Sequence, residues 1–137
     1  MLRSILAVIA GSVTWMVTAL GMDAILMSLA PQWFDTGGKV ESVPVLLFMM
    51  CYALAFSALG GYVAAAIARR REIAHAFVLG LVQLAMGVAA TINFWDTAPA
   101  WYHLTFLVLL VPANVLGGRL RQSQKAGAAG RRSMAAA

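Results

Sequence analysis

The sequence predicts an all-α integral membrane protein that folds as a four-helix bundle. The chain of 137 residues is 62% hydrophobic and 11% charged, and its mean hydropathy is +0.83. Soluble domains are about 45–50% apolar and about 25% charged. A membrane-spanning helix needs about 20 mostly apolar residues. Stretches that meet this requirement run over about 4–30, 44–68, 73–93 and 98–118. They predict one transmembrane domain over residues 1–123.

The first apolar stretch ends at Pro31, and the following segment PQWFDTGGKVES carries the Pro, Asp and Gly-Gly signals of a loop. Arg3 and the small residues of 28–30 would also fit a cleavable signal peptide. The apolar region of a signal peptide is only about 7–15 residues long. The greater length of this stretch favours a retained membrane span.

Local signals also delimit the later helices. The second stretch begins with Ser42 as a capping residue and Pro44 as a first-turn proline. The fourth stretch begins in the same way, with Asp96 and Pro99. The sequence RRRE between the second and third stretches contains no helix breaker, so its polarity is expected to end both helices. The basic, low-complexity segment 124–137 is predicted to be a disordered cytoplasmic tail.

The positive charges predict the orientation of the helices. Lysine and arginine in short loops remain on the cytoplasmic side of a membrane. An even number of spans places nine of the ten basic residues on one side: Arg3, Arg69, Arg70, Arg71, Arg119, Arg121, Lys125, Arg131 and Arg132. Both termini are therefore expected in the cytoplasm. These arginines are also expected to contact anionic lipid headgroups, whereas orientation alone explains them without a nucleic-acid partner.

Small residues predict where the helices pack, because close backbone approach drives helix association in lipid. The residues expected at helix contacts are Gly11, Gly21, Ser57, Gly60, Gly61, Ala64, Ala65, Gly80, Gly87, Gly117 and Gly118. The Gly60-Gly61 pair with its flanking small residues is the strongest of these signals. Gln83 and Asn114 are expected to form hydrogen bonds between helices.

The two halves of the sequence resemble each other. In each half a helix that begins at a proline ends in Leu-Gly-Gly followed by arginine: LGGYVAAAIARRR and LGGRLRQ. The distance from proline to glycine pair is 16 residues between Pro44 and Gly60 and 18 between Pro99 and Gly117, so the match is approximate. Two similar helical hairpins would be related by an axis along the membrane normal.

Ionisable residues inside a span are functional candidates because they are costly in hydrocarbon. Asp23 is expected about 8 Å from the midplane on the outer side, from the helical rise of 1.5 Å per residue, and His103 at a similar level. Such a pair would carry a proton or hold a cation. The alternative is an aspartate at the interface that reaches water or caps a neighbour, because Asp23 points about 140° from the small-residue stripe of its own helix.

The sequence contains no catalytic triad, metal-ligand cluster or phosphate-binding glycine loop. His75 and His103 are expected at opposite faces of the membrane, which excludes their joint ligation of one haem. No cofactor, no metal and no enzymatic activity are predicted.

The segments GGYVAAAIARRREIAHAFVLG and PAWYHLTFLVLLVPANVLGGRLR resemble a group of small, uncharacterised bacterial four-helix integral membrane proteins over about residues 55–121. The resemblance implies a location in the bacterial inner membrane. It implies no activity and no functional residues.

The leading functional prediction is a non-catalytic structural or accessory subunit that packs against itself or a larger membrane complex, because every predicted span has a small-residue face. The alternative is a small transporter or channel that uses Asp23 and His103. It would be dimeric, since two copies enclose a pathway better than one four-helix chain.

Overall fold

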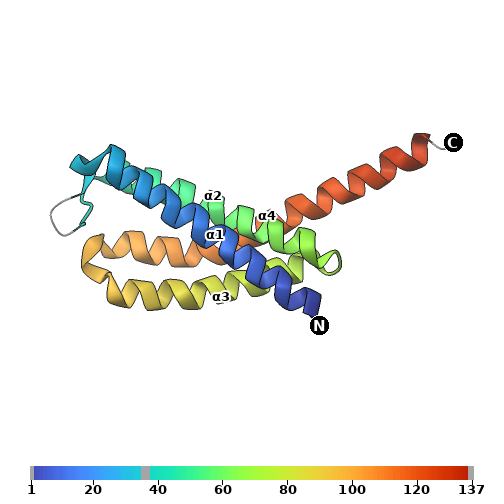
Figure 1. The fold of residues 1–137 in the computed structure, drawn as a ribbon, viewed down its shortest axis with the longest axis horizontal. Helices are drawn as coiled ribbons and strands as arrows, with labels where there is room; N and C mark the ends of the chain where they lie inside the picture. Colours follow the sequence, from blue (N-terminus) through green and yellow to red (C-terminus); the bar gives the residue numbers. More distant parts are fainter. Residues whose placement is uncertain (1, 35–37, 136–137) are drawn as a thin grey trace.

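The computed structural model describes residues 2–34 and 38–135, and all the regular secondary structure within them is helical (Figure 1). The helices are α1 (Leu2–Leu29), α2 (Val43–Ala68), α3 (Glu72–Asn93) and α4 (Ala100–Ala135), with short 3-10 turns η1 (Pro31–Trp33) and η2 (Trp95–Thr97). All four long helices have the length and composition needed to cross a membrane. The predicted all-α class with four long apolar helices is therefore confirmed.

The end of α4 differs from the prediction. The fourth helix was expected to end near 118 and the tail 124–137 to be disordered, but α4 continues to Ala135. Beyond Gly118 the chain is rich in alanine and arginine and also contains two glutamines and one lysine, all of which are strong helix formers, and it contains no proline. We call residues 119–135 of this helix the arm. Figure 1 shows the arm leaving the bundle at an angle to the first part of α4, which contains Pro112, the type of residue that bends helices.

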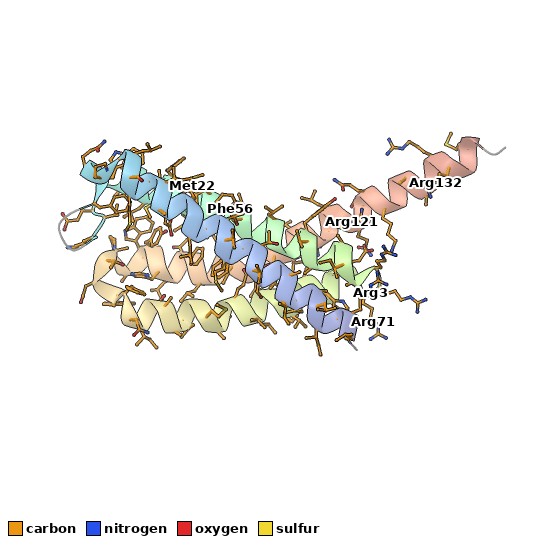
Figure 2. The ribbon with its side chains drawn as sticks, in the orientation of Figure 1. Arg3, Met22, Phe56, Arg71, Arg121 and Arg132 are labelled. Atoms are coloured by element: carbon orange, nitrogen blue, oxygen red, sulfur yellow. The ribbon has the colours of Figure 1, made fainter. Side chains whose placement is uncertain are left out.

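The helices form two hairpins that meet along α2 and α4. Helix α1 packs on α2, and α3 packs on α4. Helix α3 also contacts α2, whereas the contact between α1 and α3 is small. Helix α1 begins, and the arm leaves the bundle, at the end that carries the 69–71 turn (Figure 1). We call it the arginine end; Figure 2 shows Arg3, Arg71 and Arg121 there and Arg132 farther out on the arm. The opposite end, with residues 30–42 and 94–99, is called the aromatic end.

Glycines bring the backbones of α2 and α4 into direct contact. A Cβ atom on Gly61 would collide with the carbonyl group of Asn114, and one on Gly117 would collide with the carbonyl oxygen of Ala58. The two glycines thus lie at opposite sides of one crossing. Such close approach allows extensive van der Waals contact between backbones, which stabilises helix pairs in lipid.

The other helix pairs use glycine in the same way. A Cβ atom on Gly11 would lie 2.8 Å from the carbonyl oxygen of Gly60, and one on Gly60 would lie 2.9 Å from that of Gly11. Between α3 and α4, a Cβ atom on Gly118 would lie 2.6 Å from the Cβ of Ala76. The remaining predicted contact residues that are buried are Ser57, Ala64, Ala65, Gly80 and Gly87.

Gly21 is the exception among the predicted contact residues. It is exposed, and a Cβ atom there would have no neighbour within 4 Å. Leu26 is a buried residue of the same half of α1. At about 100° per residue, Gly21 lies about 140° around the helix from Leu26. Gly21 therefore faces away from the other helices of this chain.

Candidate functional site

Asp23 lies in the second half of α1 and is partly buried. The hydroxyl group of Tyr52 in α2 donates a hydrogen bond to its Oδ1 atom. The Tyr52 ring contacts Phe48 and Phe56 on the same helix, with ring centroids 5.5 and 5.9 Å apart. Aromatic neighbours on both sides therefore hold the tyrosine that positions the Asp23 carboxylate.

His103 lies in the first turn of α4 and is only 8% exposed. Its Nε2 atom is 3.3 Å from the carbonyl oxygen of Trp95. A carbonyl only accepts hydrogen bonds, so Nε2 carries the proton. The imidazole also stacks on the Trp95 ring, with centroids 5.5 Å apart, and meets the edge of Tyr102 at 5.9 Å. Trp95 of the η2 turn, which precedes α4, thus fixes the orientation of the His103 ring.

Asp23 and His103 line the same cleft, which has a volume of about 470 Å³. All four long helices contribute to its walls. Side-chain hydroxyl groups in the lining belong to Tyr52, Thr91 and Tyr102. Large apolar side chains in the lining are Trp15, Met16, Leu20, Met49, Met86, Phe94 and Phe106. The structure therefore brings the two sequence-predicted residues into one largely apolar site, which we call the aromatic-end cleft.

The sequence placed Asp23 and His103 at a similar depth but suggested a direct pair. In the structure each residue bonds another group: the Tyr52 hydroxyl for Asp23 and the Trp95 carbonyl for His103. Tyr52 was not predicted as a site residue. The sequence contained a signal for it, because Tyr52 and Asp23 lie at similar distances from the aromatic end. Counted from that end, Tyr52 in α2 and Asp23 in α1 are level to within about one helical turn.

Two polar side chains, Gln83 and Asn114, form a hydrogen-bonded pair between the cleft and the arginine end. Asn114 Nδ2 donates hydrogen bonds to Gln83 Oε1 at 2.8 Å and to the carbonyl oxygen of Leu110 at 2.9 Å. Gln83 and Asn114 both have 0% exposure. The pairing fits the predicted role of both residues in hydrogen bonding between helices, here α3 and α4. Close contact between the helices at this level separates the cleft from the arginine end.

A second cleft of about 350 Å³ lies at the arginine end, between the 69–71 turn and the arm. Arg69 and Arg71 have left-handed backbone angles, with φ of 59° and 49°, which reverse the chain between α2 and α3 without a glycine. Lys125 of the arm donates to the Arg69 carbonyl oxygen at 3.0 Å and to Glu72 Oε1 at 2.8 Å. Glu72 is 5% exposed, so this ion pair joins the arm to the start of α3.

Within residues 2–34 and 38–135, no group of three His, Cys, Asp or Glu side chains is arranged to hold a metal ion. Comparison of the chain with protein-family models, with curated proteins and with solved structures finds no match.

Proposed function

We propose that this chain is a small transporter of the bacterial inner membrane that binds its solute in the aromatic-end cleft. The observation that carries the proposal is the convergence of Asp23 from α1 and His103 from α4 on one cleft. A carboxylate within a membrane span costs free energy unless a partner or ligand compensates for it. A solute site gives this costly residue a role that helix packing does not.

The proposed transport requires rearrangement of the helices. The Gln83–Asn114 layer and the glycine crossings close the path toward the arginine end. The proposal includes a dimer, because two copies enclose a pathway better than one four-helix chain, and it requires the two hairpins of each chain to move against each other. Alternating exposure of a site near the bilayer midplane by such movement is a general mechanism of membrane transporters.

The proposed orientation places both termini in the cytoplasm. Arg3, Arg71 and Arg121 lie at one end of the bundle, and Arg132 lies beyond that end on the arm (Figure 2). A cytoplasmic arginine end agrees with the distribution of basic residues in membrane proteins. Arg69, Arg70, Arg71, Arg119 and Arg121 would then lie at the level of the inner headgroups. Their charge favours anionic lipids in this leaflet.

The proposed ancestry is duplication of a two-helix hairpin. The α2–α4 crossing supports it, because residues 58–61 of α2 contact residues 114–117 of α4, and both segments adjoin or contain the repeated Leu-Gly-Gly sequence. The flanking helices are not equivalent. Helix α3 contacts α2 of the other hairpin extensively, whereas α1 has little contact with α4. This difference indicates that the two halves have diverged.

A second candidate function is a non-catalytic structural or accessory subunit that packs against itself or a larger membrane complex. The observation that favours it is the lipid-facing side of α1, where Gly21 has open space around it. The arm also extends beyond the bundle (Figure 1) and offers a basic surface to a cytoplasmic partner. In this function Asp23 would act only through its hydrogen bond with Tyr52.

Flux measurements separate the two candidates. Purified protein is reconstituted in liposomes with an imposed pH gradient and membrane potential, and uptake is measured for a panel of cationic, anionic and neutral solutes. Asp23→Asn is compared with Asp96→Asn, which alters an exposed carboxylate of η2 outside the cleft lining. Native mass spectrometry records the assembly of each variant.

The transporter proposal predicts uptake of at least one solute class, loss of uptake in Asp23→Asn, normal uptake in Asp96→Asn and unchanged assembly. The accessory candidate predicts no protein-dependent uptake of any solute and a stable complex with other membrane subunits when the protein is extracted from its native membrane.

A further inference from the structure

The electrostatic character of the aromatic-end cleft is set by one carboxylate. Asp23 lines the cleft, and no lysine or arginine is among the lining residues in the part of the chain that the structure describes. The donor that the structure gives to this carboxylate is the neutral Tyr52 hydroxyl. An ionised carboxylate in a largely apolar site is stabilised chiefly by an opposite charge. The cleft is therefore complementary to a positive charge.

His103 does not provide this positive charge to Asp23. Its Nε2–H group is directed to the Trp95 carbonyl oxygen, and its ring is held by stacking on Trp95. The remaining Nδ1 atom is an acceptor when the ring is neutral. His103 thus directs its fixed N–H donor to Trp95 and not to Asp23.

The walls of the cleft suit an apolar, aromatic or alkyl body. Met16, Met49 and Met86 contribute flexible thioether side chains from three helices, and methionine adapts to ligands of different shape. Trp15 and Phe106 contribute aromatic rings, a type of side chain whose face attracts organic cations. The volume of about 470 Å³ is within the range of about 300–1,000 Å³ that is typical of small-molecule sites.

Access to the cleft lies between α1 and α3. The two helices meet toward the arginine end, where a Cβ atom on Gly11 would lie 2.6 Å from Leu79, and they diverge toward the aromatic end (Figure 1). Leu20 of α1 and Met86 of α3 line the cleft and are 61% and 39% exposed. In a membrane this exposed surface faces lipid, so a molecule dissolved in the bilayer can enter sideways.

We infer that the aromatic-end cleft binds a lipophilic organic cation, such as a substituted ammonium or phosphonium ion, with its positive centre beside Asp23 and its apolar groups between α1 and α3. This inference rests on the proposed assignment of the cleft as a solute site and adds the chemical class of the solute.

Tetraphenylphosphonium and tetraphenylborate test the inference, because they have nearly the same size and shape but opposite charge. Equilibrium binding of each radiolabelled ion is measured with purified protein in detergent. The expected result is saturable binding of tetraphenylphosphonium only. Affinity should fall at least tenfold in Asp23→Asn and be largely retained in Asp23→Glu and in the control Asp96→Asn. Native mass spectrometry verifies that the variants keep the wild-type assembly.

Equal binding of both ions, or binding of tetraphenylphosphonium that Asp23→Asn leaves unchanged, would overturn the inference. Absence of binding by either ion would overturn it as well. In that last case the flux panel still decides the proposed function separately: Asp23-dependent uptake of a neutral or anionic solute would keep the cleft as a transport site and reject only the cationic class.

Discussion

Gly117 of α4 lies directly against the backbone carbonyl of Ala58 in α2, without space for a side chain between them. Gly61 repeats this relationship with Asn114 on the other side of the crossing. The contact joins the two hairpins at the centre of the bundle. It is therefore the packing feature whose removal should have the largest effect on the fold.

Gly117→Ala should destabilise the bundle, because the new methyl group forces α2 and α4 apart. Insertion of a methyl group into a tightly packed core typically costs about 1–3 kcal/mol, and a collision with backbone leaves little room for relief. The free energy of unfolding is measured by titration with sodium dodecyl sulfate, followed by circular dichroism. Gly21→Ala is the matched control on α1. Its new methyl group meets open space. Equal loss of stability in both variants would therefore contradict the expected importance of the close α2–α4 contact.

Tyr52→Phe should change the environment of the Asp23 carboxylate, because the substitution removes the hydroxyl donor and keeps the ring. The expected result is a shift of the Asp23 carboxyl band in infrared spectra, identified by its loss in Asp23→Asn, and a roughly threefold weaker affinity for tetraphenylphosphonium. Tyr62→Phe is the control, since the Tyr62 hydroxyl group donates a hydrogen bond to Gln124 Oε1 at 2.8 Å and lies outside the cleft lining. An identical band in wild type and Tyr52→Phe would show that Tyr52 does not position the carboxylate.

Gln83 and Asn114 should be energetically coupled. In a double-mutant cycle with Gln83→Leu and Asn114→Leu, we expect a coupling free energy of about 0.6 kcal/mol, the average for hydrogen bonds between helices in a membrane protein. Denaturant titration of the two single variants and the double variant gives this value. Additive effects would mean that the hydrogen bond at 2.8 Å contributes nothing to stability.

Lys125→Met should loosen the arm more than Glu72→Gln does. The first substitution leaves the buried Glu72 carboxylate without its cation, whereas the second removes the charge that needs compensation. Because the Lys125 side chain is 55% exposed, solvent screening limits the effect to about 1 kcal/mol. Amide hydrogen exchange in residues 119–129 should become roughly fivefold faster in Lys125→Met. Arg131→Met serves as the control, and faster exchange in Glu72→Gln than in Lys125→Met would refute the expected order.

The proposed orientation predicts opposite labelling of the two ends. In a Cys51→Ser background, a membrane-impermeant maleimide should modify Gln32→Cys in intact cells. Ser123→Cys on the arm should react only after the membrane is opened. Both positions are exposed in the structure, so the membrane and not burial determines their reactivity. The reverse pattern would place the arginine end outside the cell.

The four long helices follow from hydropathy, but the surroundings of individual residues depend on how the helices rotate against each other. The small-residue stripe predicted for α1 advances by steps of about 3.5 residues and leads to Gly21. The residues that face the other helices instead follow steps of four: Ala7 and Gly11 are buried, and Trp15, Ala19 and Asp23 line the cleft. Contact along rows of every fourth residue is typical of helices that cross at a steep angle.

This difference in step explains why Gly21 does not contact another helix, and why the sequence left the orientation of Asp23 open. A shift of half a residue per turn accumulates over three turns, which turns Gly21 away from the bundle and Asp23 toward it. The partner of Asp23 could not be identified before that rotation was known. The helical arm was missed for another reason: composition suggested low complexity, whereas its alanine and long side chains also have high intrinsic helix propensity.

The continuity of α4 has a mechanical consequence. One helix includes His103 at the cleft, the Gly117 crossing and Arg132 on the arm. At 1.5 Å per residue, Gly117 lies about 21 Å from His103 and about 22 Å from Arg132 along the helix. The crossing therefore divides this part of α4 into two nearly equal lengths. A tilt of α4 as one body about the crossing would displace the wall of the cleft and the tip of the arm by similar distances.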